Sequence, residues 1–410
     1  MDSPSSRRRD GRTAAPLTAL ALALLALPAC TASSTPDAAP TSASDDHGIP
    51  AGAAAEVASP ARALIVADAE GEVVMLDLDS EERSVISPAA SDVERIDADG
   101  RLVFVTHRDG DRVRVDVIDT ARWTVPHGDH THSFLGEPQL RGSVDGTGEV
   151  RVTAGAQRAT VHFSSGEVVE LPHDDLAEVL DDAPRVTIAA DGPVVSFASH
   201  LLAATAEGTV AVFDADGAPV AGGAIPCAAA ADADLTRVGV VFACTEGAVL
   251  FTREVGGTIA AEPLPLPAGA AAATDLSGRA DRPDLAGVAG DQGAWLLDVR
   301  TRQWTLLSSD VPLLRAVAVG DDDSRTVALD AEGRVRVLAA DGTVLVRTEP
   351  LLATSVADPA LLAPVQLVVD AEHAYLSDPA AGAVHEIDHT DGIVTRTFAD
   401  LDPRFLSQVG

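Results

Sequence analysis

From residue 62 to the end of the chain, one pattern of apolar and polar positions recurs. A short run rich in β-branched residues leads into a turn that contains glycine, and a second apolar run follows and ends near an aspartate. Such alternation around Glu-Gly, Asp-Gly and Gly-x turns is typical of β-hairpins, and apolar residues at helical spacing are hard to find. The clearest copies cover residues 63–79, 102–120, 158–172, 200–217, 238–253, 285–301, 325–342 and 373–392.

These copies follow one another at intervals of roughly 40 to 50 residues. A repeat of this length with several strands per copy is the signature of a β-propeller, in which each copy forms one blade around a central channel. We therefore predict an all-β protein in which residues 62–410 form a single β-propeller. The copies favour eight blades, and seven are possible if the copies at the two ends combine into one closing blade. A flat solenoid is disfavoured because the strict short period and stacked glycines of parallel β-helices are missing.

The first thirty residues have the pattern of an export signal. Four arginines precede an apolar run from about Leu17 to Leu27, which is too short to span a membrane and ends in "LPAC". A small residue before Cys30 is typical of a lipoprotein cleavage site, although Pro28 is unusual there. We predict that residues 1–30 are a lipoprotein-type signal peptide and that Cys30 carries the lipid anchor. The alternative is an ordinary signal peptide.

Residues 31–61 are rich in Ala, Ser, Thr, Pro and Gly and contain few large apolar residues. Such a segment cannot bury enough surface to fold, so we predict a disordered tether. Within it, Asp45, Asp46 and His47 could attract a cation weakly, but a solvated linker is the simpler interpretation.

Composition narrows the classes of partner. The 410 residues carry a formal net charge of −34, from 63 acidic and 29 basic side chains, with 46% hydrophobic content. This acidity argues against a nucleic-acid partner, which needs clustered Lys and Arg. The chain contains no Lys and no Asn. It therefore has neither a P-loop lysine nor a Schiff-base lysine.

Cysteine usage agrees with export. If Cys30 is lipidated, Cys227 and Cys244 remain as an even pair in an oxidising compartment, and we predict a disulfide between them. Without a C-x-x-C neighbour, zinc ligation by this pair is disfavoured.

The densest group of candidate ligands is "HGDHTH", where three of the eleven histidines fall within six residues. Zinc prefers imidazole nitrogen and carboxylate oxygen, and this stretch supplies His127, Asp129, His130 and His132. In an extended segment His130 and His132 project to the same side, and Gly128 allows His127 to turn back toward them. The stretch follows a hairpin, so we expect a loop where one blade ends and the next begins. We predict a zinc site here; an incidental cluster in a surface loop is the alternative.

Enzymatic motifs are weak, and we expect no catalytic activity. The chain has no G-x-S-x-G elbow, no H-E-x-x-H motif and no G-x-G-x-x-G after a strand. "HEIDHTD" at residues 385–391 is the second group of histidines, but it is equally typical of a strand and a turn. "DADG" and "DDDS" lack EF-hand spacing, so we interpret them as turns.

Several segments resemble the AztD-type family of exported zinc metallochaperones, which are propellers that pass zinc to the solute-binding protein of an ABC importer. The resemblance covers most of the chain and rests on four segments. They are "DDHGIPAGAAAEVASPARALIVADAEGEVVMLDL", "VTHRDGDRVRVDVIDTARWTVPHGDHTHSF", "GVVFACTEGAVL" with the Cys227 and Cys244 pair, and "YLSDPAAGAVHEID".

This chain has fewer histidines than family members usually carry. Family members carry more histidines in the linker and at propeller positions, whereas this linker keeps His47, Thr153 stands where a histidine is expected, and "CAAAADAD" offers Asp232 and Asp234. Three outcomes follow: a weaker zinc site, a site rebuilt from His162, His200 or Asp232, or a relative that has lost zinc.

The resemblance implies an extracytoplasmic protein, and the lipoprotein-type signal adds a lipid anchor at the cell membrane. It would bind zinc at the "HGDHTH" segment and deliver it to the solute-binding protein of a zinc ABC importer. We expect a monomer that contacts the membrane only through its anchor. The alternative is a non-catalytic interaction scaffold that has lost zinc binding.

Overall fold

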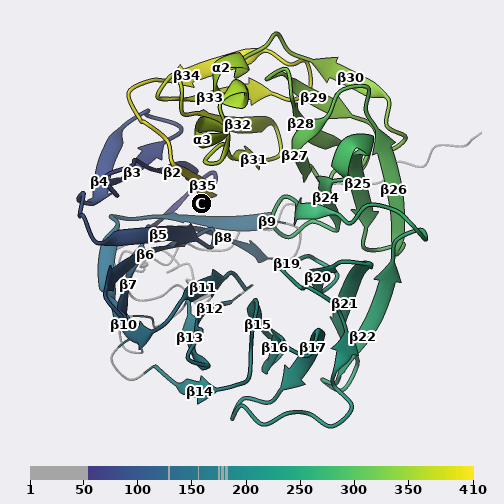
Figure 1. Cartoon of the computed structure of the whole chain (residues 1–410). Helices are drawn as coiled ribbons and strands as arrows, with labels where there is room; N and C mark the ends of the chain where they lie inside the picture. Colours follow the sequence, from purple (N-terminus) through teal and green to yellow (C-terminus); the bar gives the residue numbers. More distant parts are fainter. Residues whose placement is uncertain (1–53, 128–129, 156, 174–175, 177–179, 181–182) are drawn as a thin grey trace, which may run out of the picture. The chain divides into compact units, whose positions relative to one another are not determined.

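Antiparallel four-stranded sheets dominate the computed structural model, which describes residues 54–127, 130–155, 157–173, 176, 180 and 183–410. Eight such sheets are arranged around a common centre within this part of the chain (Figure 1). In six of them the four strands are consecutive in sequence. The fold is a β-propeller with eight blades, so the prediction of an all-β propeller and the favoured blade count are confirmed.

The strands of the blades have the following bounds. Blade 1 contains β35 (Phe405–Val409), β2 (Ala63–Ala67), β3 (Val73–Asp77) and β4 (Arg83–Ser87), and blade 2 contains β5 (Val93–Ala98), β6 (Leu102–Asp109), β7 (Arg112–Asp119) and β10 (Gln139–Thr147). Blade 3 contains β11 (Val150–Thr153), β12 (Arg158–Phe163), β13 (Glu167–Pro172) and β14 (Arg185–Thr187), and blade 4 contains β15 (Val194–Phe197), β16 (His200–Ala204), β17 (Thr209–Phe213) and β18 (Ile225–Pro226). Blade 5 contains β19 (Asp232–Leu235), β20 (Val240–Cys244), β21 (Gly247–Arg253) and β22 (Ile259–Pro265), and blade 6 contains β23 (Thr274–Ser277), β24 (Asp284–Val288), β25 (Gly293–Asp298) and β26 (Gln303–Ser308). Blade 7 contains β27 (Leu313–Ala318), β28 (Thr326–Asp330), β29 (Val335–Leu338) and β30 (Val344–Arg347), and blade 8 contains β31 (Leu367–Val369), β32 (His373–Asp378), β33 (Ala383–Asp388) and β34 (Val394–Phe398).

The two ends of the propeller chain meet in blade 1. The C-terminal strand β35 pairs antiparallel with β2, from Ala63 opposite Val409 to Ala67 opposite Phe405. The ring is therefore closed by backbone hydrogen bonds between its first and last strands. This pairing holds the first and last blades of the ring together, while each blade keeps only short edge strands.

Eight apolar clusters lie between successive blades, one at each interface around the ring. Strand β2 shows how they form. Ala63 and Ile65 belong to the cluster shared with blade 2, whereas Leu64 and Val66 belong to the cluster shared with blade 8. Because both faces of such a strand are buried, its sequence is continuously apolar, which explains the short apolar runs of the repeat.

The cysteine pair joins the segment that follows blade 4 to a strand of blade 5. The Sγ atoms of Cys227, which follows β18, and Cys244, at the end of β20, are 2.00 Å apart. The predicted disulfide is therefore present.

Helical segments are few and short in the described part of the chain. The helical segments in the described residues with defined bounds are α2 (Ala353–Ala357), α3 (Pro359–Leu362) and the 3-10 helix η2 (Gly290–Gln292). Within the described part of the chain, none is long and apolar enough to cross a membrane.

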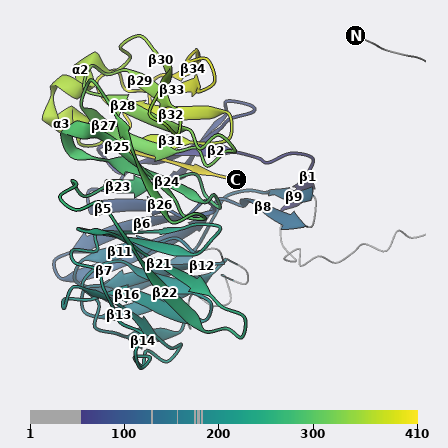
Figure 2. The ribbon, with the colours of Figure 1, turned by 90° about the vertical axis from the view of Figure 1, so that its right-hand side faces the viewer.

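A separate three-stranded sheet projects from the propeller on one side (Figure 2). It contains β1 (Ala55–Val57), β9 (His130–Leu135) and β8 (Arg122–His127), in that order. Strand β1 lies inside the range 31–61 that was predicted to be a tether, so ordered structure begins before residue 62. Residues 1–53 lie outside the described residues, and the signal peptide, Cys30 and the rest of the tether stay predictions.

Candidate metal centre

The "HGDHTH" segment occupies the end of the hairpin formed by β8 and β9. This hairpin is inserted between β7 and β10, the third and fourth strands of blade 2. The expectation of a loop between two blades was therefore wrong. The reason is that β10 is the outer strand and is mostly exposed, so its sequence lacks the apolar run that identified the other strands.

Buried contacts at its base hold the hairpin against the propeller. Arg122 is 6% exposed, and its Nη1 donates to Asp77 Oδ2 at 2.8 Å. The rings of Trp123 and Phe134 stack with centroids 5.0 Å apart, and the guanidinium of Arg101 lies 4.0 Å from the Trp123 centroid. These contacts give the projecting sheet a defined direction relative to blades 1 and 2.

Two of the predicted ligands lie side by side on β9. The Nε2 atoms of His130 and His132 are 3.1 Å apart, as expected for side chains at positions i and i+2 of a strand. The backbone register places His127 directly opposite His130. Asp129 lies outside the described residues. The structure therefore brings His130 and His132 together and places the backbone of His127 beside them.

Glu56 on β1 also reaches this group. Its Oε1 lies 2.6 Å from Nδ1 of His132, the ring nitrogen opposite the one that faces His130. Sequence reasoning missed Glu56 because it falls in a segment with few large apolar residues. The short alternation Ala-Glu-Val at 55–57 was the one local signal for a strand.

The described residues alone do not form a complete metal group. Among the described residues, no three His, Cys, Asp or Glu side chains are placed to hold one ion together. Glu56 contacts the far nitrogen of His132, so it supports that imidazole and is not a third ligand. Of the four predicted ligands, the structure describes the Nε2 atoms of His130 and His132. A zinc site with four ligands would also require the side chains of His127 and Asp129.

The remaining described histidines are dispersed, as expected, and several contact carboxylates individually. Nδ1 and Nε2 of His107 lie 3.2 and 3.3 Å from Asp92 and Asp116, and Nε2 of His173 lies 2.8 Å from Asp99. These pairs sit in different parts of blades 2 and 3. None of them supplies three ligands to one point.

The three residues that could rebuild a zinc site elsewhere in the propeller do not form a metal group either. His162, His200 and Asp232 lie on β12, β16 and β19, which belong to three different blades. His162 is 4% exposed, and burial lowers the pKa of its imidazole, with the nearby Arg151 charge acting in the same direction. His200 directs Nδ1 to the carbonyl oxygen of Ala198 at 2.9 Å. The described residues therefore do not support a three-ligand site rebuilt from this set.

The "HEIDHTD" segment forms the end of a strand and a turn, which was one of its two interpretations. Asp388 Oδ1 accepts the backbone N–H of Thr390 at 2.7 Å, and Asp391 Oδ1 accepts that of Ile393 at 3.0 Å. The turn at "DADG" 214–217 follows the same rule, because Asp214 Oδ1 accepts the N–H groups of Asp216 and Ala218.

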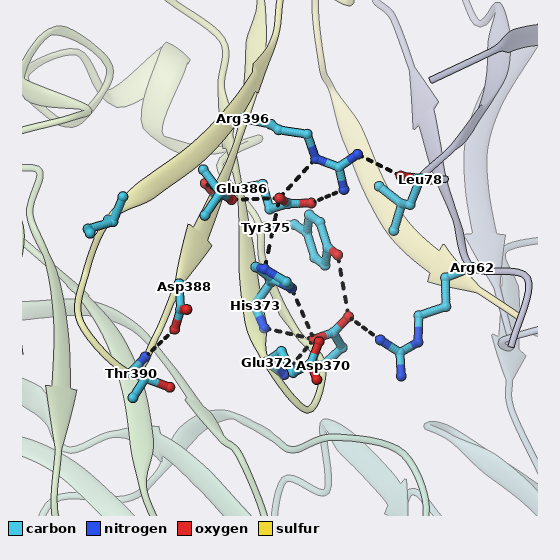
Figure 3. Close-up of polar contacts among 12 residues, drawn as sticks. Arg62, Leu78, Asp370, Glu372, His373, Tyr375, Glu386, Asp388, Thr390 and Arg396 are labelled. Carbon is cyan, nitrogen blue, oxygen red and sulfur yellow. Dashed lines mark hydrogen bonds and ion pairs between the residues drawn. The ribbon is translucent and has the colours of Figure 1, made fainter. Parts of the chain in front are cut away.

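A polar network beside this segment joins the last blade to the first (Figure 3). The carboxylate of Asp370 accepts from Nη1 of Arg62 at 3.1 Å and from the Tyr375 hydroxyl at 3.3 Å. Glu386 pairs with Arg396, whose Nη1 donates to the carbonyl of Leu78. These groups have structural partners across the closing seam, so we assign them to ring closure and not to a metal site.

Two carboxylates lie on the innermost strand of blade 5, near the centre of the ring (Figure 1). Asp232 and Asp234 are two residues apart on β19 and therefore share one face. Burial raises the pKa of Asp234 well above its ordinary value of 3.8, and the neighbouring Asp232 charge raises it further.

This shift gives the stability of the protein a pH dependence. A raised pKa in the folded state means that protonated Asp234 stabilises the fold at low pH and that this contribution is lost as the pH rises through the folded pKa. Asp234→Asn should therefore raise the melting temperature by about 1 to 3 °C at pH 8, and the gain should shrink toward pH 4. The measurement is a series of thermal melts across this range. Asp216→Asn, at an exposed turn, makes the same change of charge and serves as the control.

No protein-family model matches the sequence, and no curated protein matches it. Solved structures do match its fold. The structure of apo AztD from Citrobacter koseri aligns with a TM-score of 0.70 and 16% sequence identity, over 86% of this chain and 98% of that chain. A crystal structure of Citrobacter koseri AztD aligns with a TM-score of 0.71 and 15% identity, over the same shares of the two chains. The chain thus has an AztD-like propeller fold, as the sequence resemblance implied.

Proposed function

We propose that this protein binds zinc at the end of the β8–β9 hairpin, through His127, Asp129, His130 and His132. It would deliver the ion to the solute-binding protein of a zinc ABC importer. In this proposal zinc is cargo, and the protein acts outside the cytoplasm, held to the cell membrane by a lipid on Cys30. No bond in a substrate is made or broken.

The separation of the two Nε2 atoms carries the proposal. Four ligands around zinc at Zn–N distances of about 2.0 to 2.1 Å lie about 3.3 Å from one another in a tetrahedron. The observed separation between His130 and His132 is 3.1 Å. The two imidazoles are thus already spaced as neighbouring zinc ligands, and only a small outward movement is needed to admit the ion.

The position of the hairpin suits transfer. It projects from the propeller (Figure 2), and the side chain of His130 is exposed. An acceptor can therefore approach the ion from outside, and ligands can be exchanged stepwise. The net charge of −34 also favours attraction of cations to the surface. The AztD-like fold supports the proposal at the level of the scaffold.

Transfer can be tested directly. Protein from residue 31 onward is loaded with one equivalent of zinc and mixed with a metal-free solute-binding protein of a zinc importer, and the two are separated for metal analysis. We expect zinc to move to the acceptor even when a chelator captures any ion released into solution. If the chelator intercepts all of the zinc, direct delivery is excluded and the protein only stores the ion.

Acidification should weaken zinc binding. Imidazole must be neutral to coordinate a metal, so protons compete with zinc for histidine ligands. We expect the apparent dissociation constant to rise by at least about tenfold between pH 7.5 and pH 5.5. Titration with zinc at several pH values measures this. A constant affinity over the range would rule out a ligand set dominated by histidine.

A further inference from the structure

The contact between Glu56 and His132 joins the hairpin to a different part of the chain. Glu56 lies on β1, which directly follows the N-terminal segment, and 76 residues separate it from His132. The two side chains meet because β1 pairs with β9 at three positions, with Glu56 opposite Phe134 and Val57 opposite Ser133. A partner of one predicted zinc ligand is thus supplied by a short edge strand.

This contact determines which nitrogen of His132 carries the proton. A carboxylate accepts hydrogen bonds, so the close Glu56 oxygen holds the proton on Nδ1. Nε2 then keeps its lone pair, and it is this nitrogen that faces His130. Carboxylates that orient metal-binding histidines in this way typically contribute about 10- to 100-fold to metal affinity.

We propose that Glu56 is a positioning residue of the zinc site and that pairing of β1 with β9 controls how tightly zinc is held. This inference rests on the proposed function. When β1 is paired, Glu56 keeps Nε2 of His132 ready for the ion. When β1 separates from β9, that support is lost and zinc leaves faster. Strand β1 thereby becomes part of the release mechanism.

The structure of β1 makes such separation feasible. The strand has three residues, and none of them is buried. The eight apolar clusters of the ring contain no residue of β1, and the ring is closed by β35 on β2. Short, exposed segments with few buried contacts open at low free-energy cost. Loss of β1 pairing should therefore leave the propeller intact.

The ladder also shows how to break the pairing without touching Glu56. The N–H of Gly136 donates to the carbonyl of Ala121 at 2.8 Å. Because hydrogen-bonded and non-hydrogen-bonded pairs alternate in an antiparallel ladder, the backbone of Ser133 points away from β8 and toward Val57. Proline at position 57 removes the N–H that this pair requires.

The experiment compares Glu56→Gln, Val57→Pro and the double variant with the parent, and Glu137→Gln is the control. Glu137 is exposed, and its replacement changes the net charge by the same amount as that of Glu56. Zinc dissociation is followed by transfer to a fluorescent chelator. We expect about 10- to 100-fold faster release from each single variant, no further increase in the double variant, and no change in the control.

Two further measurements make the result decisive. Nitrogen-15 chemical shifts of the imidazole in metal-free protein should report the Nδ1–H form of His132 in the parent and a loss of this preference in Glu56→Gln. Melting temperatures should remain within about 1 °C of the parent, since β1 lies outside the ring clusters.

The outcomes separate this inference from the proposed function. If the parent binds no zinc, the proposed function fails, while the chemical shifts still test the role of Glu56. If the parent binds zinc and both single variants release it at the parental rate, the inference is overturned. Additive effects in the double variant would also overturn it, because Glu56 and the β1 pairing would then act independently.

Discussion

Replacing His127, His130 and His132 together with alanine should reduce zinc affinity by more than about 100-fold. Loss of a single group that merely orients a ligand costs about 10- to 100-fold, and here three ligands are removed. The change should leave the fold intact, because these residues lie at the end of a projecting hairpin and outside the apolar clusters between blades. Isothermal titration of metal-free protein measures the affinity, and a thermal melt checks the fold.

The control for this prediction is a pair of dispersed histidines. His200→Ala and His385→Ala remove imidazoles that interact with Ala198 and Thr397 and should leave zinc affinity unchanged. Zinc binding that survives the triple replacement would move the site to another part of the chain. Absence of binding in the parent as well would indicate a scaffold that has lost its metal, and a protein partner would then be sought.

Arg336→Ala should lower the free energy of unfolding by about 3 to 5 kcal/mol. Arg336 is 2% exposed, its Nε lies 2.6 Å from Asp330 Oδ2, and its Nη1 lies 2.5 Å from Asp310 Oδ1. Asp330 is fully buried and also accepts two backbone N–H groups of its turn, those of Glu332 and Arg334. Removal of the guanidinium leaves a buried carboxylate without its counter-charge, and the desolvation penalty of that charge is then uncompensated.

Arg95→Ala provides the comparison for this replacement. Arg95 also pairs with a carboxylate, Asp97, but its side chain is 53% exposed. Exposed ion pairs contribute at most about 1 kcal/mol, so the variant should unfold close to the parent. Calorimetry or urea denaturation measures both. If the two replacements cost the same, the burial of the Arg336 pair does not matter to stability.

Recurring local patterns were sufficient to predict most of the architecture. Hairpin turns such as those at residues 214–217 and 388–392 depend on an aspartate that accepts nearby N–H groups, which is a contact between near neighbours in sequence. The continuous apolar runs reflect strands that are buried on both faces, as in β2. Because these signals repeat eight times, the fold class and blade number could be predicted without any knowledge of distant contacts.

The strands that were missed have weak local signals. Strand β10 is mostly exposed, and β1 consists of three residues without a buried side chain. Both are strands because of the partner beside them, β7 for the first and β9 for the second. Glu56 contacts His132, which lies 76 residues further along the chain. The residues around Glu56 therefore do not indicate this contact.

By itself, the sequence determined the propeller, its repeat, the disulfide partners and the candidate ligands, since each of these depends on short-range pattern or on residue type. Tertiary structure decided where those ligands are presented. It placed "HGDHTH" on a hairpin inserted within blade 2, brought the Nε2 atoms of His130 and His132 to 3.1 Å, and added Glu56 from another segment. These features depend on strand register and on pairing between residues far apart in the chain, which are selected by the packing of the whole domain and not by the residues of any one segment.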